Sequence, residues 1–142
     1  MYLKNILSIS EYPGLFEERA QTNVGKVAIT LIDEKRVITS LSKQYSMLSE
    51  IQIYCKGNEI TLIEVLEKIL NHEGGKSLNI KPKANAIDLH AYFLGIIEKY
   101  DTNRVCSSDI NKINQWYNIL LQSKNLRIKV NNLKQINLLT RI

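Results

Sequence analysis

Residues 51–75 have the sequence IQIYCKGNEITLIEVLEKILNHEGG, and within them the spacing of the apolar residues changes from that of a strand to that of a helix. Ile51, Ile53 and Cys55 alternate with Gln and Tyr, the period of two expected of a strand with one buried face. After Thr61 the apolar residues recur every three or four positions, which is typical of an amphipathic helix. The two patterns in one short chain predict an α+β fold.

A first helix is predicted to begin at Thr61. Thr61 and Glu64 are spaced as a capping box, in which hydroxyl and carboxylate accept the free N–H groups of a helix start. The helix should end before residues 74–77 (GGKS), because glycine tolerates the left-handed conformation that commonly terminates a helix. GGKS also resembles the end of a phosphate-binding loop, but that pattern needs a glycine where Leu70 lies and must open a helix, so we interpret it as a turn. The stripe expected to face the core is Leu62, Val65, Leu66, Ile69 and Leu70.

Two more helices are predicted. One follows Pro82, from about residue 84 to 99, and the other begins at a cap supplied by Ser107, Ser108 or Asp109 and runs to about Leu121. The apolar face assigned to the second helix is Ile87, Ala91, Leu94 and Ile97, broadened by Phe93 and Ile96; the third has Ile110, Ile113, Tyr117 and Leu120, with Trp116 and Leu121 beside them.

The N-terminal region is predicted to be mainly β. Short strands fit residues 26–32, 36–41 and 51–55, whereas residues 3–9 fit a short helix that ends at the turn Tyr12-Pro13-Gly14. Several short strands at intervals of about ten residues favour a small antiparallel β-barrel of SH3-like or Sm-like size. We therefore divide the chain into a small β-barrel domain (1–57), a three-helix domain (58–123) and a basic C-terminal segment (124–142).

Positive charge is concentrated at the C-terminal end. The chain carries 19 Lys and Arg against 14 Asp and Glu, a net charge of +5. No acidic residue follows Asp109, whereas six basic residues lie in 111–142. Such a segment attracts phosphate backbones by screened Coulomb interaction, although a solvated end that keeps a protein soluble has the same composition.

No catalytic or metal-binding motif is present. His72, His90, Cys55 and Cys106 are zinc-ligand types, but each lies more than a dozen residues from the next, whereas zinc ligands usually come in close pairs. His90 is instead expected to be partly buried and satisfied by its neighbours. The two cysteines fit a reducing cytoplasm better than a disulfide framework, and a bridge between them stays open as an alternative. We expect no catalytic residue, cofactor or metal, no membrane span and a cytoplasmic location.

Residues 100–118, YDTNRVCSSDINKINQWYN, gather ionic and aromatic residues around a helix start. Trp116 and Tyr117 fit the third helix, one buried and one at its margin. Arg, Trp and Tyr also dominate the energetics of protein-binding surfaces, so an exposed Arg104-Trp116-Tyr117 patch is the alternative.

The expected function is that of a non-enzymatic binding or adaptor protein that acts through protein contacts. The alternative is an RNA- or DNA-binding protein that uses the basic C-terminal segment and the barrel surface, since small barrels bind RNA through aromatic side chains with basic neighbours. The candidate partner-binding residues are Arg104, Trp116, Tyr117, Lys124, Arg127, Lys129 and Lys134.

Five tracts of the chain carry a family resemblance. They are LKNILSIS-x-x-PGL (3–15), Ala20-Gln21-Thr22, Asp33-x-Lys35-Arg36, Leu48-Ser49-x-Ile51-x-Ile53-Tyr54 and, most specific, residues 100–118. Together they resemble an uncharacterised family from Bacteroidetes with an N-terminal domain of unknown function followed by a small helical segment. The similarity spans Tyr2 to Leu121 and implies a cytoplasmic bacterial protein of two small parts, without an assigned activity or agreed catalytic residues. Family members often end in a long acidic tail, whereas this chain ends in a short basic segment.

Overall fold

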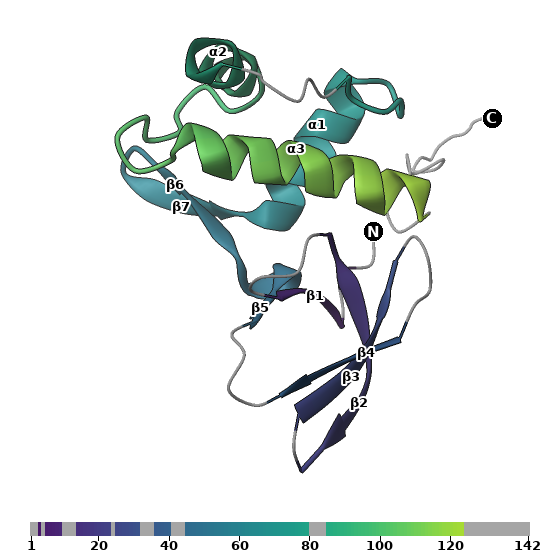
Figure 1. Cartoon of the computed structure of the whole chain (residues 1–142). Helices are drawn as coiled ribbons and strands as arrows, with labels where there is room; N and C mark the ends of the chain where they lie inside the picture. The colour runs from purple at the N-terminus through teal and green to yellow at the C-terminus, as the bar shows by residue number, and fades with distance from the viewer. Residues whose placement is uncertain are drawn as a thin grey trace, which may run out of the picture.

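The residues that the structure describes form a five-stranded antiparallel sheet, a separate two-stranded hairpin and three α-helices (Figure 1). The structure is a computed structural model and describes residues 3, 5–9, 14–23, 25–31, 36–40, 45–79 and 85–123. In chain order the elements are β1 (Ile6–Ile9), β2 (Phe16–Thr22), β3 (Gly25–Thr30), β4 (Arg36–Ser40), β5 (Tyr45–Met47), the 3-10 helix η1 (Leu48–Glu50), β6 (Gln52–Cys55), β7 (Asn58–Thr61), α1 (Leu62–His72), α2 (Ala86–Ile96) and α3 (Ser107–Gln122).

The large sheet is open, so the predicted SH3-like or Sm-like barrel is wrong. Its strands lie in the order β4-β3-β2-β1-β5, which puts β4 and β5 at opposite edges. A barrel closes only when its two outer strands pair, and no such pairing occurs among the described residues. The strand predicted at 51–55 instead pairs with β7, because Ile53 and Cys55 are buried in the cluster formed mainly by the helices. The α+β class itself is confirmed.

β1 lies where a short helix was predicted, at residues 3–9, and that prediction is wrong. β1 pairs with β2 on one side and with β5 on the other, so it is an interior strand. Leu7 and Ile9 belong to one buried cluster while Ile6 belongs to the other, so both faces of β1 are covered. A short apolar run buried on both faces has no alternation, and periodicity cannot separate it from a helix.

The β6–β7 hairpin lies in the chain between the large sheet and the helices. Its two-residue turn places Gly57 at a φ of 87°, a conformation that glycine adopts without steric cost. β7 was not predicted, because its first two residues, Asn58 and Glu59, are polar and exposed. In Figure 1 the hairpin lies beside α3, in the same half of the view as the helices, whereas the lower ends of β2 and β3 lie at the bottom.

α1 confirms the prediction from the capping box. The Thr61 hydroxyl accepts the backbone N–H of Glu64 at 3.2 Å, and the five residues of the predicted stripe are all buried. The helix ends at His72 and is followed by Gly74 and Gly75, with φ values of 65° and 81°; the Gly75 N–H donates to the carbonyl of Leu70. GGKS therefore terminates a helix, as the sequence indicated.

α2 presents a different face to the core from the one predicted. Ile87 is 80% exposed and Leu94 48% exposed, whereas Phe93 is fully buried and Ile97 nearly so. The Phe93 ring meets the ring of Tyr100 edge-on, with 4.8 Å between centroids. The assignment of Ile87, Ala91 and Leu94 to the buried face is therefore wrong.

α3 has the predicted buried face, Ile110, Ile113, Tyr117 and Leu120, but a different N-cap. The cap residue is Cys106, whose N–H donates to the Asp109 carboxylate at 3.0 Å. Asp109 thus stabilises the helix start from the third helical position and is not the cap itself. None of the helices in the described ranges is long and apolar enough to cross a membrane.

Candidate functional site

The predicted partner-binding residues divide into three groups in the structure. Arg104 is exposed and Trp116 is half-buried at the edge of the core, while Tyr117 is fully buried and its hydroxyl donates to the Lys76 carbonyl at 2.7 Å. One aromatic residue is buried and the other lies at the margin, as the helix periodicity indicated. The remaining candidates, Lys124, Arg127, Lys129 and Lys134, lie outside the described residues.

Arg104 and Trp116 line the same groove, which we call the β6–α3 groove. It has a volume of about 230 Å³ and lies between β6 on one side and the first half of α3 on the other. Its lining is mainly apolar, with charged residues at Arg104, Asp109 and Lys112. The full set of lining residues is Ile51, Gln52, Ile53, Tyr54, Arg104, Val105, Asp109, Lys112, Ile113 and Trp116.

An arginine–aromatic stack forms one end of the groove. The Arg104 guanidinium carbon lies 3.7 Å from the centre of the Tyr54 ring, within the range of a cation–π interaction. A second hollow, lined by Tyr54, Arg104 and the β6–β7 turn, adjoins the groove at this stack. The guanidinium has five N–H donors, and the contact with the ring leaves those that point away from the ring available to an acceptor.

The charge of the groove is positive on balance. Within the described part of the chain, neither Arg104 nor Lys112 forms an ion pair. The carboxylate of Asp109 already accepts the N–H of Cys106, so it is partly committed to the helix start. The groove therefore offers two cations to a negatively charged group.

β6 meets the chain around Tyr100 along only part of its outer edge. The Asp101 N–H donates to the Tyr54 carbonyl at 2.9 Å, and the Lys56 N–H donates to the Lys99 carbonyl at 2.8 Å. The Asp101 carbonyl accepts the N–H groups of both Arg104 and Val105, which turns the chain away from β6. This turn puts Arg104 over Tyr54 and opens the groove beside Gln52.

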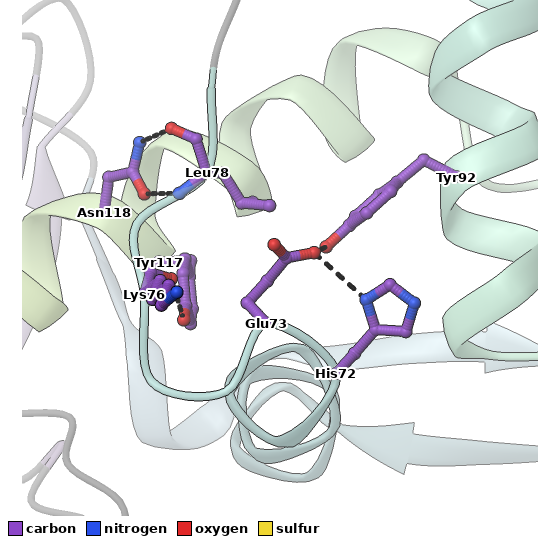
Figure 2. A network of polar contacts seen from close by, with 7 residues as sticks. All are labelled: His72, Glu73, Lys76, Leu78, Tyr92, Tyr117 and Asn118. Carbon is purple, nitrogen blue, oxygen red and sulfur yellow. Dashed lines mark hydrogen bonds and ion pairs between the residues drawn. The ribbon is translucent and has the colours of Figure 1, made fainter.

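A second polar cluster, at the C-terminal end of α1, holds the helices together (Figure 2). The Glu73 carboxylate accepts the Tyr92 hydroxyl at 2.8 Å and lies 3.0 Å from His72 Nδ1. Asn118 on α3 accepts the N–H of Leu78 at 2.7 Å and donates to its carbonyl at 2.9 Å. These contacts connect the end of α1 to α2 and α3, and we assign them a structural role.

The phenols of this cluster predict a loss of stability in alkali. Burial, followed by the hydrogen bond to Glu73, raises the pKa of Tyr92, and burial also raises the pKa of Tyr117. The fold thus favours the neutral phenols, so this stability is present below the ordinary tyrosine pKa of 10 and decreases as the pH rises above it. Urea unfolding from pH 8 to 11.5 should show this decrease, and Tyr92→Phe should make it less steep. Parallel curves for the two proteins would contradict the expectation.

The residues considered as metal ligands lie apart. The described ranges contain no group of three His, Cys, Asp or Glu side chains arranged to hold a metal. Cys55 is buried, Cys106 is exposed, and the two are unpaired. His90 is half-buried and its Nδ1 lies 2.6 Å from the Tyr100 hydroxyl, which confirms the prediction of a histidine satisfied by its neighbours.

Tyr54 and Lys112 are groove residues that were not among the partner-binding candidates predicted from the sequence. Tyr54 is 39% exposed because its side chain lies on the solvent-facing side of β6, opposite the buried Ile53 and Cys55. An aromatic residue at a solvent-facing strand position was the available signal. Its proximity to Arg104, fifty residues later, depends on how the 99–105 loop packs against β6.

Two family models match successive parts of the chain. Residues 3–48 match the Domain of unknown function (DUF5606), and residues 51–120 match the Domain of unknown function (DUF6852). A solution NMR structure of a Bacteroides vulgatus protein, a structural genomics target, is similar with a TM-score of 0.75 and 36% identity, over 89% of this chain and 90% of that chain. Comparison with curated proteins gives no match. The chain therefore belongs to the uncharacterised Bacteroidetes-type family that combines these two domains of unknown function.

Proposed function

We propose that this protein is a non-enzymatic binding or adaptor protein that holds a protein partner in the β6–α3 groove. The observation that carries the proposal is the composition of the groove, an apolar surface open to solvent and flanked by Trp116, Tyr54 and Arg104. Arginine, tryptophan and tyrosine supply most of the binding energy in protein interfaces, and they do so in well-packed pockets. The unpaired cysteines support a cytoplasmic location.

The proposal is tested by comparing partner capture by matched variants. The tagged wild-type protein, cross-linked in its source cells, should capture protein partners. The Trp116→Ala and Arg104→Ala variants should each capture a tenth of that amount or less. Lys68→Ala on α1 is the control, because it removes the same charge from an exposed residue outside the groove. Partners captured equally by all four proteins would contradict the assignment of the groove.

The second candidate function is RNA or DNA binding. The observation in its favour is the excess of positive charge after residue 110, of which Lys112 lies at the groove beside aromatic side chains. Nucleic-acid binding that depends on phosphate contacts weakens steeply with salt. If the protein binds nucleic acid, its affinity for an oligonucleotide should decrease as the salt concentration is raised from 50 to 200 mM. Truncation of the chain after Ser123 should abolish the binding. A salt-independent affinity would exclude it.

A further inference from the structure

We propose that the β6–α3 groove binds an extended, acidic peptide segment, which pairs as an additional strand with the free part of the β6 edge. This inference rests on the proposed protein-binding function and specifies the conformation and charge of the partner. Strand addition supplies affinity through backbone hydrogen bonds, and pockets for alternate side chains supply specificity.

The ladder between β6 and β7 determines which backbone groups of β6 face the groove. The Leu62 N–H donates to the Ile51 carbonyl at 3.0 Å, so Ile51 points its carbonyl toward the β7 side. Successive residues of an antiparallel strand alternate between its two edges, so Gln52 and Tyr54 direct their N–H and C=O groups to the opposite edge. The bond from the Asp101 N–H to the Tyr54 carbonyl lies on that edge and agrees with this alternation.

Three of the four groups on this edge are left for a partner. The Tyr54 carbonyl is used, but the Tyr54 N–H and both backbone groups of Gln52 have no partner among the residues that the structure describes. The Asp101 carbonyl, which could have completed the pair with Tyr54, accepts the N–H groups of Arg104 and Val105 instead. A peptide strand would therefore continue the line of residues 99–101 along β6, where the chain's own backbone leaves it.

The side chains around this edge define the chemistry of the segment. A strand in the groove lies beside Val105, Ile113 and Trp116, which can bury an apolar side chain. Arg104 and Lys112 have no ion pair within the described residues, so they complement carboxylates on the same segment. The expected sequence alternates an apolar residue with Asp or Glu.

The charge also argues against other occupants of the groove. Residues 124–142 of the chain carry five basic residues and no acidic one, so Arg104 and Lys112 would repel them. A second copy paired through the same edge would bring the same cations together. Nucleic acid would match the charge but would leave the apolar lining and the strand edge without suitable contacts.

The test begins with peptides selected for binding the full chain from a random ten-residue phage library. The selected peptides should be acidic and apolar, and Trp116→Ala and Arg104→Ala should each weaken them tenfold or more. The tightest peptide is then N-methylated at one amide at a time. Strand pairing predicts a loss of tenfold or more at alternate amides and less than threefold at those between, since only every second amide faces β6.

A proline variant tests the β6 edge from the side of the protein. Gln52→Pro removes the free N–H without removing a bond to β7, and Ile51 already has the φ of −78° and ψ of 136° that suit a residue before proline. The variant should weaken the peptide tenfold or more, while Glu59→Pro, which changes an outward-facing position of β7, should leave affinity unchanged. In the wild-type protein, the amide hydrogens of Gln52 and Tyr54 should exchange at least tenfold more slowly when the peptide is bound.

Different failures have different meanings. If selection yields no peptide that Trp116→Ala weakens, both the proposed function and this inference are wrong. If such peptides bind but N-methylation gives no alternation and the Gln52 and Tyr54 amides gain no protection, only strand addition is wrong. The inference would be overturned if a uridine octanucleotide bound the groove more tightly than any peptide, because the site would then belong to nucleic acid. It would also be overturned if the Gln52 and Tyr54 amides were already protected in the free chain and lost that protection on truncation after Ser123, because residues 124–142 would then occupy the edge.

Discussion

Replacing Phe93 by alanine is expected to lower the free energy of unfolding by about 3–5 kcal/mol. The Phe93 side chain is fully buried and its ring contacts the ring of Tyr100 edge-on, so the truncated protein loses both the burial and the aromatic contact. Urea denaturation followed by circular dichroism measures the change, provided that the dependence on urea concentration stays the same.

Ile87→Ala is the matched control on the same helix. Ile87 is 80% exposed, so its truncation should change stability by no more than about 0.5 kcal/mol. The apolar face predicted from the sequence contains Ile87 and is only broadened by Phe93, so it would make truncation of Ile87 costly as well. A loss of several kcal/mol for Ile87→Ala with little effect of Phe93→Ala would mean that α2 presents its other face to the core.

Replacing Asn118 by alanine is expected to cost about 2 kcal/mol and to release the extended segment around Leu78. The Asn118 amide is bonded to both the N–H and the carbonyl of Leu78, at 2.7 and 2.9 Å, and truncation leaves both partly buried groups unsatisfied. Asn118→Asp keeps the acceptor but places a carboxylate against the Leu78 carbonyl, so we expect it to be at least as destabilising.

The position of the effect distinguishes this contact from general helix destabilisation. Hydrogen exchange of the Leu78 amide should accelerate in both Asn118 variants, whereas Gln115→Ala, at an exposed position of the same helix, should leave it unchanged. Unaltered Leu78 exchange in Asn118→Ala would show that the segment is held by other contacts.

The elements with strong local signals could be predicted from the sequence. The capping box at Thr61, the regular stripe of α1 and the glycines after it describe that helix through interactions within a dozen residues. α2 has apolar residues on two faces, Ile87 and Leu94 on one and Phe93 and Ile97 on the other. The hydrophobic periodicity of α2 therefore does not determine which of the two faces is buried. That depends on packing against Tyr100 and the other helices.

The barrel prediction was wrong for a related reason. Strand patterns indicate where strands occur, but the pairing of β1 with β5 joins residues far apart in the chain, such as Leu7 and Met47. The groove depends on such pairing too. Arg104 and Trp116 were candidates from their residue types, whereas Tyr54 joins them only because the 99–105 loop lies along β6. Tyr117 follows Trp116 by one residue, a rotation of about 100° on a helix, and that rotation takes it into the core.

The different surroundings of the two cysteines make the wild-type sequence suitable for spectroscopic labelling. Thiol reagents attack the thiolate, and burial raises the pKa of the Cys55 thiol, with the nearby Glu64 carboxylate adding to the effect. Cys106 is exposed and immediately follows Val105 in the wall of the groove. A maleimide dye added to the native protein should therefore attach at one position, close enough to the groove for its fluorescence to report occupancy without an engineered cysteine.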